Sequence, residues 1–160
     1  MSTFLGIDLG TSSVKLLLID ENQTVIASSN ASLDVHRLHP GWSEQNPVDW
    51  ISATEVAIAA LKSSNPAAVA AISGIGLSGH MHGATLLDAS DAVLRPCILW
   101  NDTRSHLEAS ELDAQPIFRK LTGNIVFPGF TAPKVLWVAR HEPDVFKRIA
   151  KVLLPKDFMR

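Results

Sequence analysis

Two apolar segments near the start of the chain lie so close together that they restrict its fold. Residues 4–8 and residues 14–20 both have the pattern of strands, and only five residues separate them. A connection this short joins antiparallel strands, because parallel neighbours need a crossover of about a dozen residues or more. Residues 24–35 alternate in polarity and follow a second short turn. The chain is therefore predicted to open in an antiparallel β-meander.

Helices and further strands are expected after this opening. A helix should begin at Pro47, with Asn46 as its N-cap candidate, and end before Pro66. Residues 69–77 are mostly apolar and are predicted to form a strand buried on both faces. The remaining pattern predicts strands at residues 84–87, 93–94, 97–100 and 152–154, and helices at residues 103–113, 117–121, 134–141 and 143–150. This order indicates an α/β fold with a mixed sheet.

The composition excludes several classes of protein. The 160 residues are 46% hydrophobic and carry a formal net charge of −2, so no overall field attracts nucleic acid or an anionic membrane. The weakly polar run at residues 67–77 is much shorter than the ~20 residues that a membrane span needs. Cys97 is the single cysteine, which excludes an internal disulfide and a cysteine-based zinc site. We expect a protein of the cytoplasm.

The turn between the first two strands is the segment richest in chemical groups. Its glycine permits a close backbone approach, and its hydroxyl groups add donors to the backbone N–H groups of an anion-binding turn. Asp8 would repel a phosphate unless Mg²⁺, usually with waters, stood between them. An ordinary polar hairpin is the alternative interpretation. The phosphate-site candidates are Asp8, Gly10, Thr11, Ser12, Ser13 and Lys15.

A second polar cluster follows the strand expected at residues 69–77. Met81 and His82 lie between glycines, where α/β folds place ligands, and His82 suits contact with a neutral ligand. His80 and His82 would point to opposite faces of an extended segment, which disfavours a shared metal ion. A structural role for these histidines is the alternative.

A third polar group ends the strand expected at residues 97–100. Asn101 and Asp102 supply donors and acceptors for hydroxyl groups, and Trp100 offers an apolar platform for the carbon face of a sugar. Asp102 would serve equally well as the N-cap of the helix expected from Thr103. Sugar contact and helix capping are both open for Asp102.

One motif in the chain points to a different class of protein. Residues 74–79 match the dinucleotide-binding pattern GxGxxG and follow an expected strand. The residues that come next do not have a helical pattern, so the helix dipole that binds the phosphates is missing. This motif therefore does not support a dinucleotide enzyme.

Six segments, taken in order, resemble successive motifs of the FGGY carbohydrate kinases. The first is shared by other actin-like ATPases, so the later ones carry the specificity, and the last two narrow the resemblance to kinases of xylulose. The resemblance implies an actin-like (ribonuclease H-like) fold and ATP-dependent phosphorylation of D-xylulose to D-xylulose 5-phosphate. The segments are residues 8–15, 42–45, 81–88, 98–102, 128–134 and 153–158.

The same resemblance implies roles for the candidate residues. Asp8 would organise Mg²⁺ and phosphate through water, the turn from Gly10 to Ser13 would bind phosphate, and Lys15 would add positive charge. Met81 and His82 would contact the sugar, with Asn101 and Asp102 in the neighbouring pocket. One departure is His80, since family members often have glutamine there.

Members of this family are roughly three times as long and contain two actin-like domains. Residues 1–160 would then be an incomplete N-terminal domain with the sugar-binding half, without the second, ATP-binding domain and without the general-base aspartate. This chain by itself is predicted to be inactive, because phosphoryl transfer depends on positioning and charge stabilisation. Kinases of this family are often dimers, so the resemblance allows a homodimer.

Two other functions are open at this point. One is another FGGY kinase that acts on ribulose, gluconate or glycerol, although a gluconate site should favour extra positive charge near Met81, which is not evident. The other is a non-catalytic actin-like module that binds sugar or nucleotide.

Overall fold

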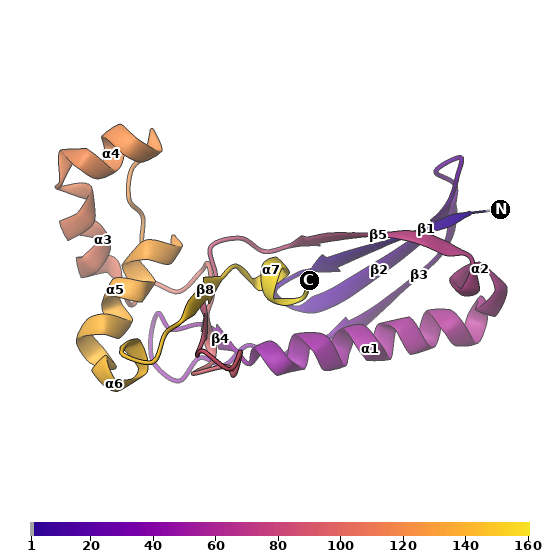
Figure 1. Cartoon of the computed structure of the whole chain (residues 1–160), viewed down its shortest axis with the longest axis horizontal. Coiled ribbons are helices and arrows are strands. Elements are labelled where there is room, and N and C mark those ends of the chain that lie inside the picture. Colours follow the sequence, from indigo (N-terminus) through magenta and orange to yellow (C-terminus); the bar gives the residue numbers. More distant parts are fainter. Residues whose placement is uncertain (1) are drawn as a thin grey trace. The chain divides into compact units, whose positions relative to one another are not determined.

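The computed structural model describes residues 2–160. The chain divides into two compact units, which are shown in Figure 1. Unit 1 comprises residues 2–34, 48–80 and 159–160, and unit 2 comprises residues 35–47 and 81–158. The phosphate-site candidates therefore belong to unit 1, and the sugar-site candidates belong to unit 2.

Unit 1 is built on a mixed sheet with the strand order β3-β2-β1-β5. The strands β1 (Thr3–Leu9), β2 (Ser13–Asp20) and β3 (Val25–Ser32) are antiparallel neighbours. The strand β5 (Ile72–Gly79) runs parallel to β1 (Figure 1). The predicted β-meander and the mixed sheet are both confirmed.

The helix α1 (Pro47–Ser64) lies along one face of this sheet (Figure 1). Trp50 and Ala57 of the helix are fully buried, as are Leu9 and Leu18 of the sheet. The Ser29 hydroxyl donates to the Ala57 carbonyl at 2.8 Å, which ties β3 to the helix. The predicted helix is confirmed, and its apolar face supplies the core of unit 1.

The prediction for residues 69–77 is wrong in two respects. The short helix α2 (Pro66–Ala70) takes the first of these residues, because Pro66 favours the first position of a helix, and β5 begins only at Ile72. No residue of β5 is fully buried, whereas burial on both faces was predicted. Within residues 2–160 this strand pairs only with β1, so its other edge is not covered by a further strand.

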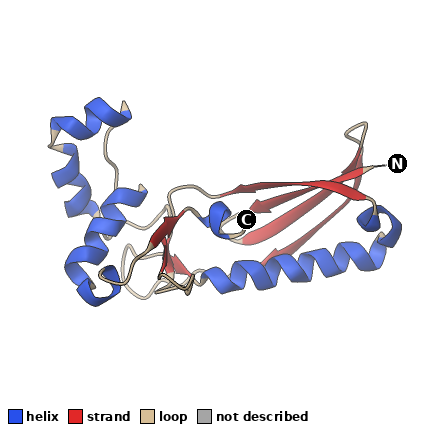
Figure 2. Cartoon of the chain, viewed as in Figure 1, coloured by secondary structure: helices blue, strands red, loops and turns tan. Residues whose placement is uncertain are grey.

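Unit 2 combines short strands with helices (Figure 2). Its core contains Ala84, Leu86, Ile98, Trp137 and Val138, and Trp42 packs against it with its ring centroid 5.5 Å from that of Trp137. Both tryptophans are therefore packing residues of unit 2. The paired strands are β4 (Glu44–Gln45) with β7 (Cys97–Ile98) and β6 (Thr85–Leu87) with β8 (Lys151–Leu153); the helices are α3 (His106–Asp113), α4 (Pro116–Thr122), α5 (Thr131–His141), α6 (Pro143–Phe146) and α7 (Pro155–Phe158).

Several element bounds in unit 2 differ from the prediction, among them the start of α5 at Thr131 instead of residue 134 and the end of β7 at Ile98 instead of residue 100. The helix α3 begins at His106 instead of residue 103, and α6 ends at Phe146 instead of residue 150. Val93 forms only an isolated bridge to Leu87, while β6 pairs with the distant β8. This last pairing joins residues far apart in the sequence, which local periodicity does not reveal.

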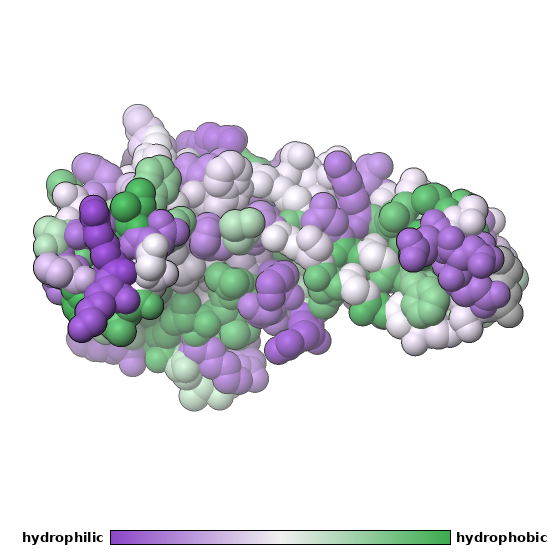
Figure 3. All heavy atoms as spheres, turned by 90° about the horizontal axis from the view of Figure 1, so that it is seen from above, coloured by the Kyte–Doolittle hydropathy of each residue, from purple (hydrophilic) through white to green (hydrophobic). Residues whose placement is uncertain are grey.

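Large apolar side chains reach the surface of both units (Figure 3). In unit 1 they include Phe4 and Leu17, which alternate with the buried residues of β1 and β2 and so lie on the sheet face opposite α1. In unit 2 they include Leu121 and Phe127. No helix within residues 2–160 has the length and apolar character needed to cross a bilayer.

Candidate functional site

The turn from β1 to β2 is tight and held at two points. The backbone N–H of Gly10 donates to the Ser13 carbonyl at 3.0 Å, and that of Leu33 donates to the Ser12 carbonyl at 2.9 Å. A Cβ on Gly10 would lie 3.0 Å from the Ser13 carbonyl oxygen, so a side chain at this position would crowd the turn. The structure therefore explains the glycine by a close approach within the turn itself.

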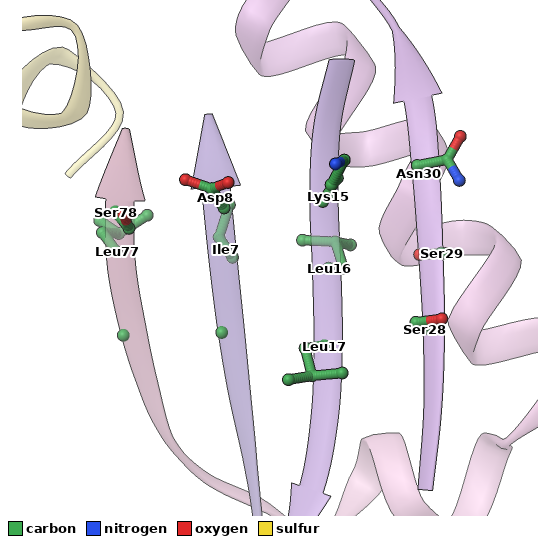
Figure 4. A pocket seen from close by; sticks show the side chains of 12 residues that line it. Ile7, Asp8, Lys15, Leu16, Leu17, Ser28, Ser29, Asn30, Leu77 and Ser78 are labelled. Carbon is green, nitrogen blue, oxygen red and sulfur yellow. The ribbon is translucent and has the colours of Figure 1, made fainter. Parts of the chain in front are cut away.

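Four polar side chains form a row across the sheet where this turn begins (Figure 4). Asp8 of β1 is in register with Lys15 of β2 and with Ser78 of β5, and Lys15 is in register with Asn30 of β3. All four residues are exposed on the face opposite α1 and line a hollow of about 620 Å³. Asn30 and Ser78 were not among the candidates from the sequence, since only the strand register places them beside Asp8 and Lys15.

Asp8 and Lys15 are available to a ligand. Within residues 2–160, neither the Asp8 carboxylate nor the Lys15 ammonium makes a hydrogen bond or an ion pair. Mg²⁺ prefers oxygen ligands and keeps several of its waters, and an exposed carboxylate beside a hydroxyl-rich turn suits such binding. The donors present in unit 1 therefore fit a hydrated Mg²⁺ ion with a phosphate group.

The loop after β5 presents the sugar-site candidates of unit 2. Met81 is 62% exposed, and His82 has a backbone φ of +66°, a left-handed conformation that is uncommon outside glycine. The extended conformation predicted for His82 is therefore wrong. Its ring lies 4.5 Å, centroid to centroid, from that of Phe130. Burial, together with the positive charge of Lys134, lowers the pKa of His82 below 6.5, so the imidazole is neutral at pH 7 and can both donate and accept.

The buried side chain of Lys134 binds the backbone of this loop. Lys134 is 0% exposed, and its Nζ atom donates to the His82 carbonyl at 2.7 Å and to the Gly129 carbonyl at 2.6 Å. The Thr131 hydroxyl also donates to the His82 carbonyl, at 3.3 Å. Burial lowers the pKa of Lys134 to about 8. Lys134 belongs to the motif at residues 128–134, for whose residues the sequence predicted no individual role.

The same segment lies against the turn that carries Trp100 and Asn101, both of which are exposed. A Cβ on Gly129 would lie only 2.6 Å from the Trp100 carbonyl oxygen, which shows how closely the two backbones approach. The structure therefore brings the His82 loop and the Trp100 turn against one stretch of chain, from Gly129 to Lys134.

Asp102 occupies a different position from that of its neighbour Asn101. It is 0% exposed, and its carboxylate accepts hydrogen bonds from the backbone N–H of Ser43 at 2.6 Å and of Arg104 at 2.9 Å. The prediction that Asp102 caps a helix from Thr103 is wrong, because the bond to Arg104 N–H closes a local turn and α3 begins later, with Ser105 as its N-cap.

Asp102 belongs to a buried cluster of charges in unit 2. Arg104 has a side chain only 1% exposed, and it pairs with Asp102 at 2.7 Å and with Glu44 at 2.7 Å. Arg95 pairs with Glu44 as well. The guanidinium of Arg104 also lies 3.6 Å from the centroid of the Trp42 ring. The motif at residues 42–45 is thus explained by its contacts with two arginines.

Gly83 offers a direct test of the packing beneath the His82 loop. A Cβ at Gly83 would lie 2.6 Å from Pro155 Cγ and 3.0 Å from Cys97 Sγ. We expect Gly83→Ala to lower the free energy of unfolding by about 1–3 kcal/mol through overpacking. Pro155→Ala removes the nearer obstacle, so the double variant should be less destabilised than the sum of the two single variants. Urea unfolding of all three checks this, and strict additivity would contradict it.

Two sequence interpretations are settled by these positions. Cys97 is buried, and its burial raises the pKa of the thiol to about 12, which is typical of an unreactive structural cysteine. Residues 74–79, which match GxGxxG, lie within β5, and the chain that follows them is not helical. The dinucleotide interpretation therefore has no structural support.

The mixed sheet of unit 1, with an acidic residue and a hydroxyl-rich turn at the end of its first strand, defines an actin-like ATPase domain. Residues 3–160 match the model of the N-terminal domain of the FGGY family of carbohydrate kinases. The chain belongs to this family, which confirms the resemblance found in its motifs.

Individual relatives agree with this family. The chain is 52% identical to xylulose kinase of Escherichia coli K12 over 158 residues, which cover 98% of this chain and 32% of that protein. The crystal structure of a xyloylose kinase from Brucella ovis matches with a TM-score of 0.98 and 66% identity, covering 99% of this chain and 33% of that one. Xylulose kinase from Rhodospirillum rubrum matches with a TM-score of 0.92 and 34% identity, covering 98% and 33%. The chain thus spans about a third of the length of these relatives.

Proposed function

We propose that the natural-length protein containing this chain transfers the γ-phosphoryl group of ATP to D-xylulose and forms D-xylulose 5-phosphate. The observation that carries the proposal is the 52% identity to a xylulose kinase over 98% of the chain. The half-buried imidazole of His82 and the exposed donors of the Trp100 turn suit a polyhydroxylated ligand, and the Asp8 turn suits a phosphate.

The residues of unit 1 would serve the phosphate end of the reaction. The turn from Gly10 to Ser13 would bind phosphate oxygens through N–H and hydroxyl donors, and Lys15 would balance their negative charge. Asp8 would hold a hydrated Mg²⁺ ion, which neutralises charge on the phosphates when bound. In the transfer, a sugar hydroxyl oxygen bonds to the γ-phosphorus, the bond from that phosphorus to the β–γ bridging oxygen breaks, and ADP leaves.

The residues of unit 2 would serve the sugar. Neutral His82 can accept a hydrogen bond from one sugar hydroxyl or donate one to it, and Asn101 offers an amide for another. Met81 and Trp100 provide exposed apolar surface for the carbon face. Asp102 enters the proposal as a residue that orients the Ser43 and Arg104 backbones, since its carboxylate is occupied inside the protein.

The proton of the attacking hydroxyl needs a general base, and by the resemblance to the family we place this base outside residues 1–160. We further propose a protein of the cytoplasm, where ATP is at hand and the Cys97 thiol stays reduced. A homodimer is included in the proposal on the same resemblance, and sedimentation of the natural-length protein tests it.

A turnover experiment tests the proposed activity. ADP release is measured with Mg-ATP and D-xylulose, L-ribulose, gluconate or glycerol, for the natural-length protein and for the 160-residue chain in parallel. We expect selective turnover of D-xylulose by the long protein and none by the short chain, which would hold an incomplete set of catalytic groups. Turnover by the short chain would contradict the proposal that residues 1–160 lack part of the catalytic groups. Absence of turnover by the long protein with all four substrates would indicate a binding module instead.

A further inference from the structure

Lys134 is a buried cation that the reaction described above does not use. Its side chain is 0% exposed, and within residues 2–160 it forms no ion pair with a carboxylate. Burying a charge is costly unless it is paired or well hydrogen-bonded, and this one is compensated by two carbonyl oxygens. The carbonyls that bind it therefore point to its role.

Those two carbonyls belong to the two segments that frame the sugar-site candidates. One is the carbonyl of His82 itself, at 2.7 Å from Nζ, and the other is that of Gly129, at 2.6 Å. Gly129 lies against the Trp100 backbone, since a Cβ on Gly129 would lie only 2.6 Å from the Trp100 carbonyl oxygen. One ammonium group thus joins the His82 loop to the backbone that supports Trp100.

The His82 loop requires such a restraint. A non-glycine residue with φ of +66° adopts a sparsely populated conformation, which persists only where the surroundings over-determine it. The Thr131 hydroxyl gives the same carbonyl a second donor at 3.3 Å. Both donors come from the start of α5, so the helix holds the peptide that sets the direction of the His82 ring.

We propose that Lys134 is a positioning residue for sugar recognition, which fixes the left-handed His82 peptide and the Gly129 backbone so that the His82 loop and the Trp100 turn face the same ligand. This inference rests on the proposed function, because it assigns the loop to the sugar. Lys134 acts through His82 and Gly129, and it does not itself touch the substrate.

The test replaces the ammonium in the natural-length protein. Lys134→Met keeps a side chain of similar length and removes both hydrogen bonds, so we expect the KM for D-xylulose to rise about 10-fold or more, since a misplacement of about 1 Å can cost up to 100-fold. The KM for ATP should stay unchanged. Lys120→Met, which removes an exposed lysine of α4, is the matched control and should leave both constants unchanged. An unchanged KM for D-xylulose in folded Lys134→Met would overturn the proposal.

A second readout does not depend on activity. The positive charge of Lys134 lowers the pKa of His82, so Lys134→Met should raise that pKa toward 6.5 in an NMR titration of the imidazole, while Lys120→Met should not. If the wild type phosphorylates none of the four sugars, the proposed function fails, and this titration alone judges whether Lys134 governs His82. An unchanged titration curve would then overturn the inference.

Thr131→Val serves if Lys134→Met does not fold. It removes the weaker donor to the His82 carbonyl and keeps the buried charge compensated. We expect a smaller rise in the KM for D-xylulose with an unchanged KM for ATP. Equal changes in both constants, or none, would contradict a positioning role.

Discussion

Replacing Arg104 by methionine is expected to lower the free energy of unfolding by about 3–5 kcal/mol, the loss typical of removing one partner from a buried ion pair. The guanidinium is 1% exposed and faces the carboxylates of Asp102 and Glu44, each at 2.7 Å. Without it, the Asp102 carboxylate stays buried and loses the guanidinium with which it forms an ion pair. Arg95 still pairs with Glu44, so the larger part of the loss should come from Asp102.

A control separates this effect from loss of charge in general. Arg148 also pairs with a carboxylate, that of Asp88, at 3.2 Å, but its side chain is 65% exposed. Arg148→Met should therefore change stability by less than about 1 kcal/mol, since water screens exposed pairs. Equilibrium urea unfolding, followed by tryptophan fluorescence, compares the two variants. Similar losses for both would contradict the role given to the buried cluster.

A double-mutant cycle then assigns the loss to the pair. In Arg104→Met/Asp102→Asn the buried negative charge is removed together with its partner, so the double variant should be more stable than the sum of the single losses predicts. Additive losses would show that Arg104 acts mainly through its packing on Trp42, whose ring centroid lies 3.6 Å from the guanidinium.

The substitution Asp8→Asn is expected to lower kcat of the natural-length protein by about 10²–10³-fold, the scale measured for loss of one preorganised electrostatic contact. Asparagine keeps the shape of the side chain and removes its charge, so binding of a hydrated cation should weaken. The carboxylate has no partner within residues 2–160, so its loss should leave the fold of unit 1 intact.

Two measurements make this prediction specific to the phosphate end. The KM for D-xylulose should stay near that of the wild type, while the Mg²⁺ concentration needed for half-maximal rate should rise. Asp49→Asn, which removes an exposed acid from the first turn of α1, is the control and should leave kcat unchanged. A loss of less than about tenfold in Asp8→Asn, or 1.4 kcal/mol, would contradict the role of Asp8.

Local signals predicted most elements of this fold. The five-residue connection between the first two strands required an antiparallel pair, and the proline at residue 47 marked the start of α1. The predicted helix start at Thr103 was wrong, because the Asp102 side chain accepts a hydrogen bond from the Arg104 backbone there. The predicted strand start at residue 69 was wrong, because Pro66 begins a short helix that includes this residue.

Asp102 and Lys134 show why the roles of single residues were harder to predict. A carboxylate after a strand has the same local pattern whether it faces a ligand or a buried arginine, and Asp102 faces Arg104. Lys134 has the pattern of an ordinary helical lysine, yet its ammonium binds a carbonyl 52 residues earlier in the chain. The burial of a side chain and the identity of its partners depend on residues that are far away in the sequence.

The sequence by itself determined the order of the strands and helices in outline, the hydroxyl-rich turn after Asp8 and the membership of the FGGY family, because these depend on neighbouring residues and on motifs in series. Only the tertiary structure decided which side chains meet. Strand register placed Asn30 and Ser78 beside Asp8 and Lys15, and the packing of α5 placed Lys134 beneath His82. These contacts join distant parts of the chain, and their geometry follows from packing that no local pattern encodes.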